Sequence, residues 1–250
     1  MINTLYLVLI ALALGSCRAE PMGLSPSTDG AQGADAAQKT GPLTCPDPDA
    51  KRVLVDAAHG GGVWWFPQHA VYEPSEWHQG QALANYLRSY GYEVDEHPRD
   101  QPPLSLLMEY PIVMRAGNYA PYTEGELEAY RRFLGCDVTL LLFGEYVRSG
   151  QTDALAEDLG LEFRGIVHDV VTIFEPHELT EGVGRIKYDA GSVLIGYDPE
   201  RTLILGRLPD ESPVMGLLDH PTARIFFTGD TNGLLPLPQP FTDNLVRWLQ

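Results

Sequence analysis

Residues 137–146 read Asp-Val-Thr-Leu-Leu-Leu-Phe-Gly-Glu-Tyr, and this stretch decides the fold class. It is apolar over a strand's length, apart from Thr139, until Gly144 interrupts it. A short, continuous apolar run that ends at a turn residue is typical of a strand buried on both faces. The sequence therefore predicts a central strand here, with a sharp turn at Gly144-Glu145-Tyr146 after it.

Strands and helices alternate on the N-terminal side of this run. Strands are predicted at residues 52–57, 92–97 and 110–116, and helices over about 83–90 and 123–134. Thr123 and Glu126 have the spacing of a capping box, in which each side chain satisfies a free N–H at the helix start. Such alternation predicts an α/β domain with a mostly parallel sheet and helices on both faces.

The C-terminal half has a different pattern. Short strand-like runs occupy residues 170–174, 192–197, 202–207, 214–218 and 223–228, separated by turn residues, and a helix is predicted over 242–249. These additional β-strands are expected either to extend the sheet or to form a small antiparallel lobe. We interpret residues 51–250 as a single domain.

Five local patterns resemble the class I glutamine amidotransferase-like superfamily, and more closely its DUF4350 branch, which is associated with gliding motility or transport. They are VLVDAAHGGG at 53–62, YTEGELEAYRRFL at 122–134, LLLFGEY at 140–146, PHELTEGV at 176–183, and FTGD at 227–230 followed by DNLVRWL at 243–249. The resemblance implies a flavodoxin-like sheet. True amidotransferases have a nucleophilic Cys at the turn after the buried strand, where this chain has Glu145, so the resemblance does not imply glutaminase activity.

A candidate ligand site is expected at the carboxyl ends of the strands, where open α/β sheets bind ligands. Four loops should meet there, at residues 56–62, 117–119, 144–146 and 229–232. The candidate ligand-binding residues are Asp56, His59, Gly60, Asn118, Glu145, Asp230 and Thr231.

Several interpretations of these residues stay open. The polar groups of the four loops can form a hydrogen-bonded network that ties the loops together, or bind a divalent metal through carboxylate and imidazole. Glu145 can serve as a general base. The run His59-Gly60-Gly61-Gly62 resembles an esterase oxyanion loop, but no G-x-S-x-G elbow accompanies it. Trp64 and Trp65 follow that loop and offer a contact surface or ordinary packing.

The N-terminal segment is expected to export the chain. Residues 5–14 form an apolar run too short to span a bilayer, and Leu14-Gly15-Ser16-Cys17 resembles a bacterial lipobox. We therefore expect a signal peptide at 1–16, lipidation of Cys17, and anchoring in the outer membrane facing the periplasm. The alternative is an ordinary signal peptide.

Residues 17–50 contain the lipidated Cys and a flexible tether, because they are rich in Ser, Gly, Ala, Gln and Pro. The remaining cysteines, Cys45 and Cys136, lie before two predicted strands. Export would place them in an oxidising compartment, where they either form a disulfide or remain separate thiols.

Charge limits the range of partners. The formal net charge is −17, which repels nucleic-acid backbones and anionic membrane surfaces. We expect a non-catalytic envelope lipoprotein that binds a small molecule or an envelope protein, with no cofactor and no nucleic acid. The alternatives are an envelope hydrolase that uses carboxylate and His groups, with or without a metal, and an accessory subunit of a transport or motility complex.

Overall fold

The structure is a computed structural model, and it describes residues 44–59, 80–97, 102–118, 121–232, 237 and 239–250. The predicted signal peptide, Cys17, most of the tether, Gly60 and the Trp64-Trp65 pair lie outside the described residues. None of the described helices is both long and apolar enough to cross a bilayer.

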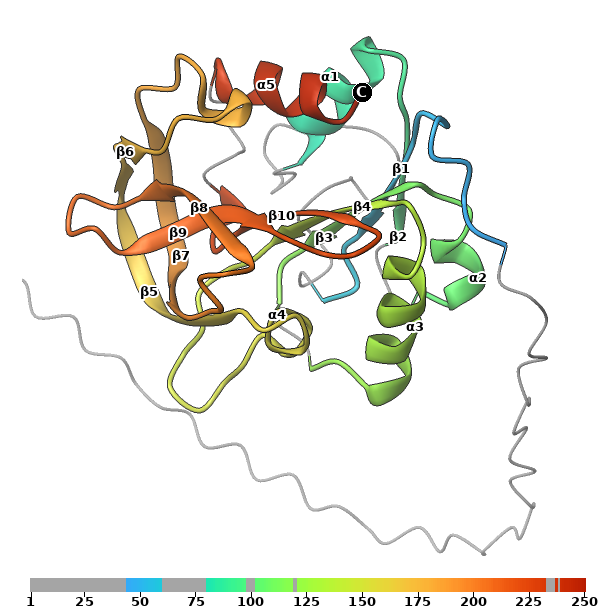
Figure 1. The fold of residues 1–250 in the computed structure, drawn as a ribbon, viewed down its shortest axis with the longest axis horizontal. Coiled ribbons are helices and arrows are strands. Elements are labelled where there is room, and N and C mark those ends of the chain that lie inside the picture. The colour runs from blue at the N-terminus through green and yellow to red at the C-terminus, as the bar shows by residue number, and fades with distance from the viewer. Residues whose placement is uncertain (1–43, 60–79, 98–101, 119–120, 233–236, 238) are drawn as a thin grey trace, which may run out of the picture. The chain divides into compact units, whose positions relative to one another are not determined.

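The core of the fold is a parallel sheet in the order β2-β1-β3-β4-β10 (Figure 1). This is the flavodoxin-like order 2-1-3-4-5, with β10 in the fifth place, and the order of the strands reverses between β1 and β3. The predicted α/β class with a mostly parallel sheet is confirmed. The five strands are β1 (Arg52–Asp56), β2 (Glu93–His97), β3 (Ile112–Ala116), β4 (Thr139–Phe143) and β10 (Arg224–Thr228).

The C-terminal half both extends this sheet and forms a second one. Three strands continue the sheet beyond β10 in antiparallel pairing, namely β9 (Pro213–Leu218), β8 (Thr202–Arg207) and β6 (Ile173–Phe174). Two longer strands, β5 (Glu162–Val171) and β7 (Ile186–Gly196), pair with each other in a separate two-stranded sheet. The two arrangements that the sequence left open are therefore both present.

The prediction of a single strand over residues 170–174 is wrong. Val171 ends β5 in one sheet, whereas Ile173 begins β6 in the other. The predicted strand at 192–197 also begins too late, because β7 starts at Ile186. Register shifts interrupt the β5–β7 ladder and both strands mix exposed with buried positions, so neither shows a clean alternation in the sequence.

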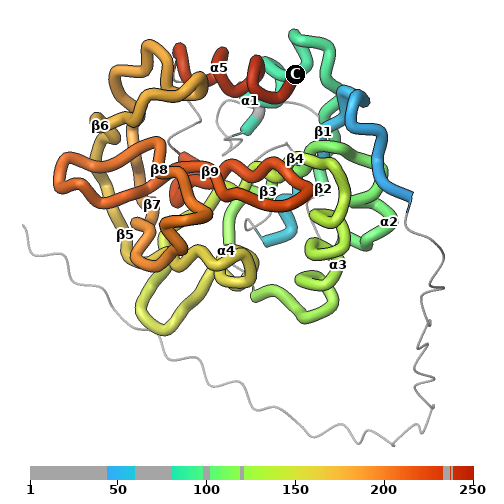
Figure 2. Tube along the Cα trace, in the orientation of Figure 1, coloured from blue at the N-terminus to red at the C-terminus, as the bar shows by residue number. Residues whose placement is uncertain are grey.

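Helices cover both faces of the parallel sheet (Figure 1). The tube in Figure 2 shows α1 and α5 together on one side, with α3 and α4 on the other. Their cores agree with this, because α1 and α5 pack in one buried cluster, and α2, α3 and α4 pack in a second. The helices are α1 (Gln81–Ser89), α2 (Leu104–Leu107), α3 (Glu124–Leu134), α4 (Ala154–Asp158), α5 (Phe241–Trp248) and the short 3-10 helix η1 (Glu178–Thr180).

The run that decided the fold class behaves as a doubly buried strand. Leu141 and Phe143 point into the α1/α5 core, whereas Leu140 and Leu142 point into the α2/α3/α4 core. All five residues of β4 are buried. Alternate residues of a strand face opposite sides of its sheet, so an unbroken apolar run is what a sheet covered on both faces requires.

The start of α3 follows the predicted capping box. Thr123 Oγ1 accepts a hydrogen bond from the backbone N–H of Glu126 at 3.3 Å, and the Glu126 carboxylate accepts one from the backbone N–H of Thr123 at 2.5 Å. This cap fixes where the helix begins, and with it the position of Glu126 beside the sheet edge.

A disulfide joins Cys45 to Cys136, with a Cα–Cα distance of 5.6 Å. Cys136 lies at the amino end of β4, just after α3. The bridge therefore attaches the last residues of the predicted tether to the edge of the domain that is opposite the carboxyl ends of the parallel strands.

Candidate functional site

The carboxyl ends of four adjacent strands bring the predicted site residues to one edge of the sheet. Asp56 ends β1, Asn118 follows β3, Glu145 follows β4 and Asp230 follows β10, and these strands are neighbours in the order β1-β3-β4-β10. Their hydrogen bonds link them to two different parts of the fold. Asp56 and His59 form hydrogen bonds with side chains of α3, whereas Asp230 and the backbone carbonyl of Glu145 form hydrogen bonds with β7.

Asp56 is held by α3. Its buried carboxylate accepts a hydrogen bond from Tyr130 Oη at 2.6 Å and another from the backbone N–H of Ala58 at 3.1 Å. Burial raises the pKa of Asp56, and these hydrogen bonds together with the nearby His59 and His97 only partly oppose that shift. Burial first, and the Asp56 charge second, likewise raise the pKa of Tyr130, so Tyr130 stays a donor.

His59 is fixed on two sides. Its Nε2 lies 2.9 Å from Glu126 Oε1, and its ring stacks on Tyr122 with centroids 3.8 Å apart. Glu126 also caps α3, so one carboxylate both starts the helix and orients the imidazole. Only 5% of His59 is exposed.

Behind Asp56 and His59 lies a buried ion pair that the sequence analysis missed. Arg115 of β3 donates two hydrogen bonds to Asp153, at 2.9 and 2.7 Å, and both residues are 1% exposed. Burial is the largest single effect and disfavours the Arg115 cation, but the charges and hydrogen bonds of its neighbours, Asp153 first among them, together outweigh burial and raise the pKa of Arg115. The signal in the sequence was the arginine inside the otherwise apolar run at residues 110–116.

Glu145 lies in the turn after β4, where the resemblance to amidotransferases would place a nucleophilic Cys. Its carboxylate oxygens accept hydrogen bonds from Asn232 Nδ2 at 3.2 and 3.3 Å, and the same amide donates to the backbone carbonyl of Asp189 at 2.9 Å. Glu145 is 1% exposed. Asn232 therefore connects the turn after β4 to β7.

Asp230 and Thr231 complete this second network. Asp230 Oδ2 accepts from the backbone N–H of Asp189 at 2.6 Å, and its Oδ1 accepts from the backbone N–H of Asn232 at 2.7 Å. Thr231 Oγ1 donates to the backbone carbonyl of Gly144 at 2.7 Å. Ser192 Oγ donates to the backbone carbonyl of Glu145 at 2.9 Å, so β7 is bonded directly to the turn after β4.

Close backbone packing supports the same junction. A Cβ atom added to Gly229 would overlap the backbone carbonyl oxygen of Ser192 and would lie 2.5 Å from Tyr188 Oη. Gly229 is therefore required here by space, because β7 packs against the end of β10.

Some buried polar atoms at this edge have no hydrogen-bond partner. Within the described ranges they include His97 Nε2 at the end of β2, Asn118 Oδ1 after β3, and Arg115 Nε between them. An unpaired buried polar group costs free energy, and in a native structure such a group calls for a ligand, an ordered water or a functional role. These three atoms flank the point between β1 and β3 where the strand order reverses.

The cysteines and the described acidic and histidine side chains bear on thiol and metal chemistry. The chain has three cysteines; Cys45 and Cys136 form the disulfide, and Cys17 precedes the domain. In the part of the chain that the structure describes, no group of three or more His, Cys, Asp or Glu residues is arranged to hold a metal ion.

Comparison with known proteins identifies the fold. No protein-family model matches the chain, and no significant match was found among curated proteins. Among solved structures, the mmIFT52 N-terminal domain matches at 14% identity and a TM-score of 0.60, over 79% of this chain and 96% of that one. A protein from Thermoplasma acidophilum described as a GMP synthase subunit matches at 12% identity and a TM-score of 0.50, over 79% and 91%.

A ThuA-like protein from Bacteroides uniformis matches at 13% identity and a TM-score of 0.50, over 80% of this chain and 91% of its own. At such low identities these likenesses show the fold alone. They agree with the strand order and with the helices on both faces. This chain therefore carries a flavodoxin-like α/β domain, similar in fold to the GMP synthase subunit and the ThuA-like protein.

Proposed function

We propose that this chain is a cell-envelope lipoprotein whose amidotransferase-like domain binds a ligand or a protein partner and has no glutaminase activity. The observation that carries the proposal is the turn after β4. Glu145 stands where the fold would place a nucleophile, and its carboxylate is buried and hydrogen-bonded to Asn232. A carboxylate in this position cannot replace a thiolate in acyl transfer without a different mechanism.

The cysteines support the same conclusion. Cys136 lies at the amino end of β4, at the opposite end of the strand from Glu145, and its sulfur is bonded to Cys45. A disulfide sulfur is not a thiolate, so it supplies no nucleophile. We expect no release of ammonia from glutamine above the uncatalysed rate, measured with the full chain at neutral pH.

The unpaired polar atoms favour a binding role for the carboxyl edge. Asn118 Oδ1 offers an acceptor, Arg115 Nε a donor and His97 Nε2 either one. The buried Arg115–Asp153 pair adds no net charge. These features suit a neutral polar ligand with both donors and acceptors, such as a sugar or a peptidoglycan fragment, held by the predicted residues Asp56, His59, Asn118, Glu145, Asp230 and Thr231.

A thermal-shift screen of the full chain tests this binding role. Envelope sugars, peptidoglycan fragments, nucleotides and divalent metals would each be added to the chain and to its Glu145→Gln and Asp230→Asn variants. A ligand that binds the folded state raises the unfolding midpoint by mass action. A shift in the native chain that the variants lack supports a site at this edge. If no compound shifts a folded chain, the proposed ligand is wrong, and partner capture becomes the next test.

The envelope location rests on the sequence of residues 1–17. Metabolic labelling with an alkyne fatty acid should mark the native chain but not a Cys17→Ser variant. Labelling of both, or of neither, would contradict the lipid anchor. The DUF4350-like placement and the role as an accessory subunit in a transport or motility complex remain proposals of the same kind.

One observation favours the hydrolase alternative. His59 Nε2 is paired with Glu126, the arrangement in which a carboxylate orients a histidine base. If the site hydrolyses an envelope substrate, a His59→Gln variant should lose that activity while the domain stays folded. A variant that unfolds as readily as it loses activity would instead identify the pair as structural.

A further inference from the structure

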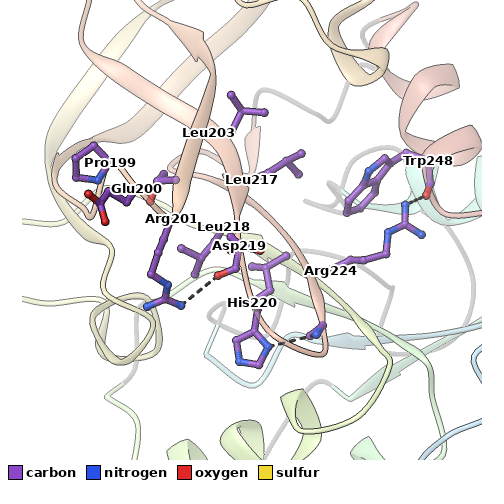
Figure 3. Close-up of a pocket in the computed structure, with 13 residues that line it drawn as sticks. Pro199, Glu200, Arg201, Leu203, Leu217, Leu218, Asp219, His220, Arg224 and Trp248 are labelled. Carbon is purple, nitrogen blue, oxygen red and sulfur yellow. Dashed lines mark hydrogen bonds between the residues drawn. The ribbon is translucent and has the colours of Figure 1, made fainter.

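A second site lies at the opposite end of the fold from the predicted one. A cleft of about 670 Å³ opens where β8, β9 and β10 meet the C-terminal end of α5 (Figure 3). This volume is within the range of small-molecule sites. None of the candidate ligand-binding residues predicted from the sequence lines it, so this inference does not rest on the function proposed above.

The floor of the cleft is apolar. The strand register places Leu203 of β8 opposite Leu217 of β9, and Leu217 opposite Phe226 of β10. These three residues form one row on the α5 side of the sheet. At one end of the row Leu203 is 49% exposed, whereas at the other end Phe226 is fully buried. The row therefore runs from the buried core out to an uncovered apolar surface.

Arg224 stands beside this floor. It lies two residues before Phe226 on β10 and so points to the same face. Its guanidinium lies over the Trp248 ring, 4.1 Å from the centroid, and donates a hydrogen bond to the Trp248 carbonyl. Both of these partners are neutral, and within the described ranges Arg224 forms no ion pair.

Nearby negative charges do not fully offset the cost of burying the Arg224 cation. Burial lowers its pKa, and the charges of Glu178 and Asp137 offset that effect only in part. A guanidinium that is partly removed from water and lacks a carboxylate partner gains the most from an incoming anion. Its planar donor fork matches the geometry of a carboxylate.

His220 lines a different part of the cleft from the Arg224 guanidinium (Figure 3). Its Nδ1 accepts hydrogen bonds from the backbone N–H groups of Ala223, at 3.2 Å, and Thr222, at 3.4 Å. Burial, and then the charge of Arg201, lower the pKa of His220, so the ring is neutral at pH 7. With Nδ1 accepting, the neutral ring carries its proton on Nε2, which is left to donate.

One acidic residue of the lining, Glu200, lies at the other end, whereas Asp219 lies next to His220. Glu200 lies beside Pro199, across the cleft from Arg224 and Trp248 (Figure 3). Arg201 lies near Glu200 and donates to the Asp219 backbone carbonyl at 3.1 Å. The carboxylate-binding end is therefore the end formed by Arg224, with the apolar floor between the two.

We propose that this cleft binds a small organic carboxylate with an apolar body. The carboxylate pairs with Arg224, and the apolar body covers Leu203 and Leu217.

Calorimetric titration of the full chain tests the proposal. The probe is 4-phenylbutyrate, and the matched neutral compound is 4-phenylbutyramide, which has the same apolar body without the charge. We expect the acid to bind at least tenfold more tightly than the amide. Equal affinities, or no binding of the acid at 10 mM, would overturn the proposal.

Two variants, each with a matched control, locate the bound ligand. Arg224→Gln should abolish the preference for the acid, whereas Arg207→Gln, which removes the same charge from the far end of β8, should preserve it. Leu203→Asp should weaken binding of the acid at least tenfold. Ile195→Asp, which places the same charge at a 56% exposed position on β7, should not.

The pair of aspartate variants keeps the test decisive if Arg224→Gln fails to fold, because Leu203 and Ile195 are both exposed. Arg224 also lines a smaller cleft nearby, but Leu203 lines only the larger one. The Leu203 variant therefore distinguishes binding in the larger cleft from binding in the smaller one. Undiminished binding of the acid to a folded Leu203→Asp variant would show that the ligand is not in this cleft.

Discussion

Asp56 shows how one buried carboxyl group makes stability depend on pH. Its pKa is raised in the folded protein because burial disfavours the charged form. The folded state therefore binds a proton more tightly than the unfolded state, and this group's contribution to stability falls as the pH rises above about 3.8, its ordinary pKa. The loss is complete once the pH exceeds the raised pKa.

An Asp56→Asn variant should remove the contribution of Asp56 to the pH dependence of stability. We expect its free energy of unfolding to fall less steeply than that of the native chain as the pH rises from about 3.8, measured by urea denaturation at a series of pH values. The amide oxygen keeps the bond from Ala58, so the variant should fold. Parallel pH profiles for the two proteins would contradict the assignment.

The Arg115–Asp153 pair predicts a large loss of stability on truncation. Asp153→Ala leaves the buried guanidinium without its partner, and breaking a buried pair from one side costs about 3–5 kcal/mol. Asp158→Ala is the control, because its partner Arg131 is largely exposed and such pairs contribute about 0–1 kcal/mol. If Asp153→Ala and Asp158→Ala lower the free energy of unfolding by similar amounts in chemical denaturation, Arg115 is not left without a partner when Asp153 is removed.

At the scale of elements, the capping box of α3 should contribute measurably. Thr123→Ala removes the side chain that accepts from the N–H of Glu126, and losing such a cap costs about 1 kcal/mol. Thr123→Ser keeps the hydroxyl and should restore most of that loss. The readout is the free energy of unfolding; an alanine variant as stable as the serine variant would mean that packing alone fixes the start of α3.

The elements also show the limits of sequence reasoning. The strand at residues 137–143 and the cap at Thr123 were predictable, because each depends on a few consecutive residues. The β5–β7 pair was not, since its register shifts and the partner of each strand depend on contacts far apart in the chain. The same limit hid Arg115, whose partner Asp153 lies 38 residues later.

At the scale of the whole molecule, the disulfide closes a long loop. Cys45 and Cys136 are 91 residues apart, and in the chain-entropy account a cross-link over such a loop stabilises the folded state by about 4.6 kcal/mol. A Cys45→Ser/Cys136→Ser double variant should be less stable by roughly that amount in chemical denaturation. Cys17→Ser should leave this value unchanged, which separates the bridge from the lipid anchor.

Short stretches of the sequence were enough to predict the fold class and the cap of α3, and to show that no cysteine directly follows the central strand. Each follows from apolar periodicity or residue identity within a short stretch, where local free energies decide the outcome. The folded arrangement was needed to show that Asp56 and His59 contact α3 while Glu145 and Asp230 contact β7, and that Arg224 borders a cleft. The neighbours of a polar group are set by strand order and layer packing, and no local pattern encodes them.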